Sequence, residues 1–399
     1  MTLNETPSAE RVHIGFFGRT NAGKSSLVNR VTGQSMSLVS SVSGTTTDPV
    51  KKAMELLPLG PVVIVDTPGF DDESTLGQMR TERTKKELEK IDAAVLVCDA
   101  GEGITKTDEE LTEIFIQNKI PYIIAYSKAD LVAERKALKE NEIYVSSQSG
   151  ENIESLKEKL ARILPHKSNK MGIVDSFVKK GDTVIMVTPI DEAAPKGRII
   201  LPQQQILRNL LDIGAIACVV QVEELGEVLN NLKVKPAAVI TDSQAFGAVS
   251  KIVPDDIPLT SFSILLANYR GMLSAAVDGV LAVNSLKDGD KILIAEGCTH
   301  HRQCNDIGSV KIPNWIRKHS GKKLSFDVVS GHEFPEDLKE YSLILHCGGC
   351  MITEKEVDVR KERAQQQNIP FTNYGITIAY IHGILKRSLE VFPELYKKI

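Results

Sequence analysis

The sequence predicts an α/β protein of three consecutive domains built on parallel sheets. Short apolar runs alternate with amphipathic segments along the chain, a pattern typical of sheets covered by helices on both faces. The length of 399 residues agrees with two to three domains at about 150 residues each. A polar stretch over residues 165–170 is typical of a linker. We therefore expect domains over residues 1–168, 169–262 and 263–399, and we find no internal sequence repeat.

The composition is that of a globular protein. Hydrophobic residues make up 42% and charged residues 25% of the chain, which excludes a wholly disordered, collagen-like or coiled-coil protein. The net charge of −4 and the single Trp argue against a nucleic-acid partner. We expect no membrane span, because every long apolar stretch is interrupted by charges. Residues 1–10 lack the layout of a signal peptide, so we expect a cytoplasmic protein with reduced thiols.

Each region supplies its own strands and helices. In the first region we expect strands over residues 12–17, 62–65, 93–98, 122–126 and 143–145, and helices over residues 24–32, 78–90, 109–118 and 152–163. In the second region we expect strands over residues 182–189, 215–220 and 237–241, and helices over residues 203–212 and 222–232. In the third region we expect strands over residues 291–295, 326–329 and 342–345, helices over residues 311–319 and 376–389, a helix end over residues 338–341, and a charged surface helix over residues 354–363.

A phosphate-binding loop follows the first strand. Gly18-Arg-Thr-Asn-Ala-Gly-Lys-Ser25 matches the pattern G-x-x-x-x-G-K-[ST] in the strand–loop–helix context that this motif needs. The backbone N–H groups of such a loop hold phosphate oxygens. Lys24 is expected to reach the β- and γ-phosphates, and Ser25 to bind Mg²⁺. The alternative, a chance match in a glycine turn, is disfavoured by that context.

The other parts of a guanine-nucleotide site follow in order. Asp66-Thr-Pro-Gly69 follows a strand, and we expect Asp66 to contact Mg²⁺ through water and the Gly69 N–H to bind the γ-phosphate. Ser127-Lys-Ala-Asp130 follows another strand, and Asp130 can accept two N–H donors of guanine. A switch loop over residues 44–48 should offer Thr46 to Mg²⁺, with Thr45 and Thr47 as alternatives. The predicted nucleotide site is Gly18, Asn21, Gly23, Lys24, Ser25, Ser26, Thr46, Asp66, Gly69, Lys128, Asp130, Ser146 and Ser147, with Lys24, Thr46 and Gly69 in catalytic roles.

Over residues 11–165 these motifs resemble the GTPase branch that includes MnmE and Era. The resemblance implies GTP hydrolysis with Mg²⁺, and Asn21 at its position implies K⁺ in place of an arginine finger. Two departures stand out. Ser127 replaces the usual Asn, so we expect the side-chain bridge to the phosphate loop to be lost. Phe70 stands where many GTPases carry a Gln that orients water, so we expect slow intrinsic hydrolysis.

Four of the six cysteines lie in the last quarter of the chain. Cys347-Gly-Gly-Cys350 follows a predicted strand and His346, and Cys298 with Cys304 follows another strand end. In a reducing compartment such clusters indicate metal or redox chemistry. On chemistry alone, an iron–sulfur cluster and a Cys/His zinc site are comparably favoured, and a dithiol pair is a third reading. Cys304 has a weaker case as a ligand.

The spacing Cys298-x-His300, followed by His346-Cys347-x-x-Cys350, resembles the signature of the HydF family of [FeFe]-hydrogenase maturation GTPases. That resemblance implies three domains: a P-loop GTPase fold, a small α/β dimerisation domain and an α/β domain that binds a [4Fe–4S] cluster. It also implies that Cys298, Cys347 and Cys350 are the ligands. Candidates for the exchangeable fourth position are Asp306, His300 and His346.

What the HydF resemblance implies for function is a scaffold. Such a protein receives a diiron precursor from radical-SAM maturases and delivers it to apo [FeFe]-hydrogenase, as a homodimer or a tetramer, with GTP as a switch. The alternative is a GTPase regulator with a structural zinc domain and a macromolecular partner. A redox enzyme that uses the Cys347/Cys350 dithiol is the third possibility.

Overall fold

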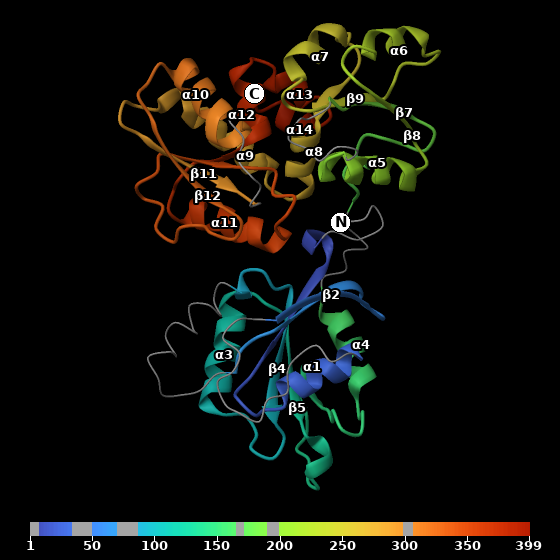
Figure 1. Ribbon diagram of the computed structural model, residues 1–399, viewed down its shortest axis with the longest axis vertical. Helices are drawn as coiled ribbons and strands as arrows, with labels where there is room; N and C mark the ends of the chain where they lie inside the picture. Colours follow the sequence, from blue (N-terminus) through green and yellow to red (C-terminus); the bar gives the residue numbers. More distant parts are fainter. Residues whose placement is uncertain (1–7, 34–49, 70–86, 165–170, 190–198, 298–305) are drawn as a thin grey trace. The chain divides into compact units, whose positions relative to one another are not determined.

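The computed structural model describes residues 8–33, 50–69, 87–164, 171–189, 199–297 and 306–399. The chain divides into two compact units, Met1–Ser168 and Asn169–Ile399 (Figure 1). Across the described residues, none of the helices has the length and apolar character needed to cross a membrane.

The first unit is a six-stranded sheet in the order β2-β3-β1-β4-β5-β6, counted over the described residues. Its strands are β1 (Val12–Phe17), β2 (Val50–Leu56), β3 (Gly60–Asp66), β4 (Ala93–Asp99), β5 (Tyr122–Ser127) and β6 (Glu142–Tyr144), and its helices are α1 (Lys24–Thr32), α3 (Lys106–Gln117) and α4 (Ile153–Ile163). Helix α3 covers one face, and α1 with α4 covers the other (Figure 1). This agrees with the predicted α/β class.

The edge strand β2 departs from the expected all-parallel sheet. It pairs antiparallel with β3, whereas the other strand pairs of this sheet are parallel. Its side chains alternate between exposed and half-buried, because an edge strand of this kind has only one face against the protein. The sequence analysis missed β2 because charged residues interrupt its apolar ones.

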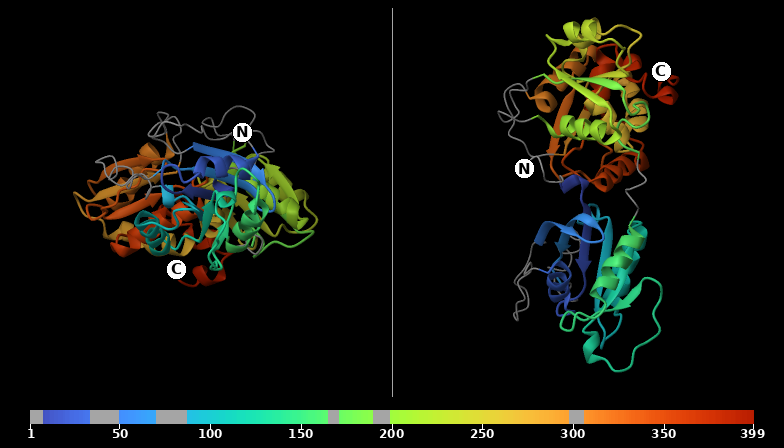
Figure 2. Two further views of the ribbon diagram at one scale, coloured as in Figure 1. Left: turned by 90° about the horizontal axis from the view of Figure 1, so that it is seen from below. Right: turned by 90° about the vertical axis from the view of Figure 1, so that its right-hand side faces the viewer.

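In its described residues, the second unit contains two four-stranded parallel sheets, in the orders β10-β9-β7-β8 and β12-β11-β13-β14. The first comprises β7 (Thr183–Val187), β8 (Ile216–Val220), β9 (Ala238–Thr241) and β10 (Leu259–Ser261), with helices α5 (Leu201–Ile213), α6 (Leu225–Asn231), α7 (Phe246–Ile252), α8 (Phe262–Tyr269) and α9 (Leu273–Val280). The second comprises β11 (Lys291–Glu296), β12 (Ser325–Ser330), β13 (Leu343–His346) and β14 (Phe371–Asn373), with α10 (Ile312–Ser320), α11 (Glu354–Gln366), α12 (Tyr374–Ile381), α13 (Leu385–Ser388) and α14 (Pro393–Tyr396). Helix α5 lies along one face of the first sheet, opposite α6 and α7 (Figures 1 and 2).

These two sheets have the same strand connectivity, and equivalent hydrogen bonds recur in both. The carboxylate of Asp182 accepts the Lys179 N–H at 2.8 Å, and that of Asp290 accepts the Lys287 N–H at 2.8 Å. Each pair leads into the first strand of its sheet. The second unit is therefore a tandem structural repeat, which the sequence did not reveal: we call β7 to α9 the middle repeat and β11 to α14 the C-terminal repeat.

The match is clearest where each repeat ends. The last strands, β10 and β14, run directly into α8 and α12, whose N-caps are the side chains of Ser261 and Asn373. Each helix then stops at a glycine with positive φ, Gly271 at 69° and Gly383 at 71°. This glycine breaks the long helix that we expected over residues 376–389 into α12 and α13, because the left-handed backbone ends a helix.

Each repeat covers the edge of the other. Helix α9 packs on β14, where the Thr372 hydroxyl donates to the Ala276 carbonyl at 2.8 Å. Helix α13 packs on β10, and its Arg387 donates to the carbonyls of Ser250, Val253 and Pro254. One apolar core runs through both repeats. The expected helix end over residues 338–341 is instead a turn that leads into β13.

Candidate functional site: a phosphate loop and a cysteine loop

The phosphate loop lies between β1 and α1. Helix α1 begins at Lys24, and its N-cap Gly23 has φ of 83° and no side-chain capping bond, so the first N–H groups of the helix face the loop without a side-chain acceptor at the cap. Gly18 has φ of +149°, and a Cβ there would lie 2.4 Å from the Val97 carbonyl oxygen. The loop therefore requires glycine at this point and presents a helix N-terminus suited to phosphate.

Three of the predicted phosphate and magnesium residues meet in one cluster. The Lys24 Nζ lies 2.8 Å from Asp66 Oδ1, and the Ser25 hydroxyl donates to Asp66 Oδ2 at 3.1 Å. Strands β1 and β3 are parallel neighbours with Phe16 opposite Asp66, so the ends of the two strands bring these residues together. Lys24 and Asp66 are both buried. The cluster therefore holds an ammonium group and a carboxylate close together, so that a phosphate could bind the first and a metal ion the second.

Gly69 closes the same end of the sheet. A Cβ at Gly69 would lie 2.6 Å from the Thr20 hydroxyl oxygen, so the backbone at Gly69 lies close to the phosphate loop. Thr46, its alternatives Thr45 and Thr47, and Phe70 lie outside the described residues.

The predicted base-recognition residues lie on two neighbouring loops. The Ser146 hydroxyl donates to Asp130 Oδ1 at 2.5 Å, which orients that carboxylate. Lys128, with φ of 55°, pairs with Asp99 at 2.6 Å. Burial raises the pKa of Asp99, but the hydrogen bond from Lys128 and further contacts bring it below its ordinary value. The carboxylate therefore remains charged and fixes the lysine.

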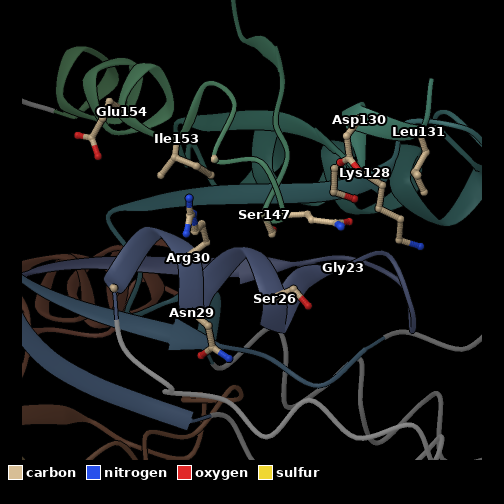
Figure 3. A pocket seen from close by; sticks show the side chains of 14 residues that line it. Gly23, Ser26, Asn29, Arg30, Lys128, Asp130, Leu131, Ser147, Ile153 and Glu154 are labelled. Carbon is tan, nitrogen blue, oxygen red and sulfur yellow. The ribbon is translucent and has the colours of Figure 1, made fainter. Parts of the chain in front are cut away.

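These loops and the phosphate loop enclose one pocket of about 870 Å³. Figure 3 shows Ser26, Asn29 and Arg30 on α1, with Arg30 on the side of the helix where the loops carry Lys128, Asp130 and Ser147. The pocket lining is Gly23, Ser26, Asn29, Arg30, Gly33, Ser127, Lys128, Asp130, Leu131, Ser147, Gln148, Gly150, Ile153 and Glu154. The sequence analysis missed Asn29 and Arg30, although their spacing of three and four residues from Ser26 puts them on one helix face.

Ser127 corrects one expectation. Its buried hydroxyl donates to the Ala22 carbonyl of the phosphate loop at 2.5 Å and lies 3.1 Å from the Cys98 carbonyl. The bridge to the phosphate loop that we expected to be lost is therefore present, made by a hydroxyl.

The cysteine loop follows β13, the neighbour of β11. The two strands are parallel with Ala295 opposite His346, so Gly297 and Cys347 follow adjacent strand ends. The Cys347 sulfur accepts the Gly297 N–H at 3.0 Å and the Gly349 N–H at 3.4 Å. Backbone donors of this kind stabilise a thiolate ligand. The donor set therefore fits a thiolate-bound metal.

The two described cysteines of this loop, Cys347 and Cys350, are half-buried. Burial raises the pKa of Cys347, and burial with the neighbouring Cys347 sulfur raises the pKa of Cys350 to about 11. Cys298, His300 and Cys304 lie outside the described residues. Within the described ranges, no three His, Cys, Asp or Glu side chains gather as a metal-binding group.

The described candidates for the fourth position differ. His346 is fully buried, with Nδ1 2.6 Å from the Cys347 carbonyl and Nε2 3.3 Å from the Arg360 guanidinium. Burial, together with the charge of Arg360, lowers its pKa to about 4. Both imidazole nitrogens of His346 therefore already have contacts. Asp306 caps a π-turn, where one carboxylate oxygen accepts from Ser309 N at 2.8 Å.

The charged run over residues 354–363 is only partly the surface helix that we expected. Helix α11 buries Glu356 and Arg360, 3% and 2% exposed, as an ion pair 2.8 Å long. The sequence analysis did not single these two out, although a Glu–Arg spacing of four is a known helix pairing.

Three family models match consecutive parts of the chain. Residues 173–271 match the hydrogen maturase F dimerization domain and residues 274–391 the hydrogen maturase F tetramerization domain, while residues 13–128 match the 50S ribosome-binding GTPase. The chain belongs to the hydrogen maturase F family. The family resemblance predicted from the nucleotide and cysteine motifs is thereby confirmed. The two hydrogen maturase F models meet between residues 271 and 274, so the dimerization model ends after α8 and the tetramerization model begins within α9.

The N-terminal unit of this hydrogen maturase F family member is also similar to other GTPases. GTPase Der of Nautilia profundicola is 32% identical over 176 residues, covering 40% of this chain and 38% of that protein. The tRNA modification GTPase MnmE of Nitrosomonas europaea is 31% identical over 169 residues, covering 41% and 37%. The solved structure of Aquifex aeolicus Era is 20% identical with a TM-score of 0.36, covering 55% and 97%. The chain spans about two fifths of the length of these curated relatives.

Proposed function

We propose that this protein binds and hydrolyses GTP and uses it as a switch. Lys24 and Gly69 act on the γ-phosphate, Ser25 and Thr46 bind Mg²⁺, and Asp130 selects guanine. The observation that carries this proposal is the buried cluster of Lys24, Ser25 and Asp66 beside a helix N-terminus. K⁺ beside Asn21 would supply the positive charge that other GTPases take from an arginine finger.

The test is a hydrolysis assay with guanine and adenine nucleotides in K⁺ and in Na⁺. The wild type should hydrolyse GTP, slowly and faster in K⁺, and Lys24→Ala should abolish it. Equal turnover of ATP, or an unchanged rate in Lys24→Ala, would overturn the proposal.

We also propose that the C-terminal repeat holds a [4Fe–4S] cluster through Cys298, Cys347 and Cys350. The support is the half-buried cysteine loop with backbone N–H groups directed at the Cys347 sulfur. When bound, such a cluster supplies an iron with an exchangeable position. Asp306 is our first candidate for that position and His300 the second, because both nitrogens of His346 have other contacts.

The family suggests what the cluster serves. We propose a scaffold that receives the diiron precursor as cargo from radical-SAM maturases and passes it to apo [FeFe]-hydrogenase. Two matched models are named for self-association, which supports a homodimer or a tetramer. The division into a GTPase domain, a dimerisation domain and a cluster-binding domain, with boundaries near 168 and 262, belongs to this proposal.

The deciding experiment is anaerobic reconstitution with iron and sulfide, followed by EPR of the reduced protein. Cys298→Ala, Cys347→Ala and Cys350→Ala should each lose the signal. Cys218→Ala, a free cysteine of β8, is the matched control and should keep it. Tightly held zinc with no iron signal would favour the alternative, a GTPase regulator with a structural zinc domain. Activity without any metal would favour the dithiol enzyme.

A further inference from the structure

We propose that Arg360 is a positioning residue for the cysteine loop: through His346 it fixes the peptide after β13 that carries Cys347. His346 then orients a ligand and does not itself bind metal. This inference rests on the proposed metal site at Cys347 and Cys350.

The chain of contacts runs from the surface to the cysteine loop. His332 lies 2.9 Å from Glu356, and Glu356 lies 2.8 Å from Arg360 Nη2. The Arg360 Nη1 lies 3.3 Å from His346 Nε2, and His346 Nδ1 lies 2.6 Å from the Cys347 carbonyl oxygen. Arg360 also donates to the Gly331 carbonyl at 2.6 Å, so the guanidinium is held from three sides.

Donor chemistry fixes the tautomer of His346. A guanidinium offers only N–H donors, so the Nε2 that faces it must accept. The proton of a neutral imidazole is then on Nδ1, where it donates to the Cys347 carbonyl. Both nitrogens have a defined role, and neither has a lone pair directed toward the cysteine sulfurs. Metal-binding histidines, by contrast, use one nitrogen for the metal.

Burial of the Arg360–Glu356 ion pair carries a desolvation cost. Arg360 and Glu356 are 2% and 3% exposed, and burying such a pair costs several kcal/mol per ion before its attraction is counted. A buried ion pair is thus weak evidence for stability alone. The structure uses this pair to hold one imidazole against one peptide group.

The turn after β9 of the middle repeat is equivalent to the turn after β13, but it has no imidazole at the end of its strand. Its equivalent of His346 is Thr241, which ends β9 and whose hydroxyl lies 3.4 Å from the carbonyl of the next residue, Asp242. A donor to the following carbonyl is therefore shared by both repeats. In the repeat that carries Cys347 and Cys350, this donor is an imidazole that also contacts a guanidinium.

The experiment uses the full chain reconstituted anaerobically, with iron content and the EPR-monitored midpoint potential as readouts. His346→Asn keeps a donor near the Nδ1 position, whereas His346→Gln places its amide near Nε2. We expect His346→Asn, which keeps the donor to the Cys347 carbonyl but loses the contact with Arg360, to weaken iron binding less than His346→Gln does. We expect His346→Gln and Arg360→Met to lower iron affinity by about tenfold to a hundredfold, the usual effect of removing an outer-shell contact, and to shift the potential.

Two controls separate positioning from folding. Arg363→Met removes the next arginine of α11, which donates to the Phe334 and Pro335 carbonyls, and should leave the cluster unchanged. Arg360→Lys keeps a donor toward Nε2 and should recover part of the affinity. Thermal unfolding of each variant reports any general loss of structure, and variants are compared at temperatures where all are folded.

The outcomes distinguish the two levels of the proposal. A cluster that is lost in His346→Asn as fully as in His346→Gln, or a strong nitrogen hyperfine coupling in wild type that vanishes in His346→Asn, would overturn the positioning role. Zinc without iron in the wild type would overturn the proposed cluster instead. In that case retention of zinc in the same variants tests the positioning role, with the same expected order.

Discussion

At the scale of single residues, the phosphate site depends on groups that satisfy one another. Lys24 and Asp66 are buried and pair at 2.8 Å, so neither charge is left without a partner. A Mg²⁺–phosphate group would offer each of them a partner of opposite charge: phosphate for the lysine and metal for the carboxylate. The site is therefore built to exchange one charge pairing for another when nucleotide binds.

Ser127→Ala is the first residue-scale prediction. The change removes the hydroxyl that donates to the Ala22 carbonyl and leaves a buried acceptor without that donor. Such a loss costs about 1–3 kcal/mol, so GTP binding should weaken by about 5- to 150-fold. Calorimetric titration with GDP and a non-hydrolysable GTP analogue measures it. An affinity equal to wild type would show that the phosphate loop holds its shape without this bridge.

Asp130→Asn tests base recognition. In the proposed site the carboxylate, oriented by Ser146, would accept two guanine donors, whereas an amide offers one donor and one acceptor. GTP affinity should fall by about tenfold or more, and the affinity for xanthosine triphosphate should rise, because xanthine presents an oxygen where guanine has an amino group. Competition binding with both nucleotides checks it. Parallel weakening for both would mean that Asp130 acts through folding of the loop.

At the scale of elements, β8 is the exposed edge of the middle sheet. Ile216 and Val219 on this strand are 58% and 45% exposed, and an apolar edge strand can pair with another chain. The match of this region to a dimerization domain makes a second copy the expected partner.

Val219→Lys should therefore weaken self-association. A charge on an edge strand opposes strand pairing, and we expect the dimer dissociation constant to rise by about tenfold, equivalent to 1.4 kcal/mol. Sedimentation equilibrium measures it. Val234→Lys, at an exposed position outside the strands, is the matched control. Equal association in both variants would move the interface away from β8.

The elements also show what could be predicted from the sequence. Helix α1 was predicted over its observed residues, because a motif and an apolar strand define its start and Gly33 its end. Strands β10 and β14 were missed because each has three residues, too few for a periodic pattern. The repeat was missed because the two copies share scattered residues, such as Thr260 with Thr372 and Gly271 with Gly383, without a continuous match.

The nucleotide site and the cysteine loop also differ in how much of each could be predicted from the sequence. The nucleotide residues follow strand ends in fixed motifs, so their neighbourhood was predictable. Gly23, Ser26, Lys128, Asp130 and Ser147 line one pocket, and Lys24, Ser25 and Asp66 contact one another. The burial of Arg360 and Glu356 could not be predicted, because the sequence of a charged helix does not show which charged side chains face the protein interior. Only the packing of α11 against the turn after β13 decides that the pair is buried beside His346.

At the scale of the whole molecule, the two repeats of the second unit cover parts of each other. Helix α9 of the middle repeat packs on β14, α13 of the C-terminal repeat packs on β10, and one core continues through both. Each repeat alone would leave a sheet edge and apolar surface uncovered, and a domain of this size is marginal when it loses part of its core. Damage to one repeat should therefore destabilise the other.

Trp315 allows a direct test, because it is the single tryptophan and lies on α10 of the C-terminal repeat. Ile185 is fully buried in β7 of the middle repeat. Ile185→Ala should cost about 2–5 kcal/mol, and this loss should appear in the urea unfolding curve followed by Trp315 fluorescence. The half-exposed Ile252 of α7 supplies the control, since Ile252→Ala should barely move that curve. A Trp315 transition that stays at the wild-type midpoint in Ile185→Ala would mean that the repeats unfold independently, and reciprocal edge covering would then contribute little to stability.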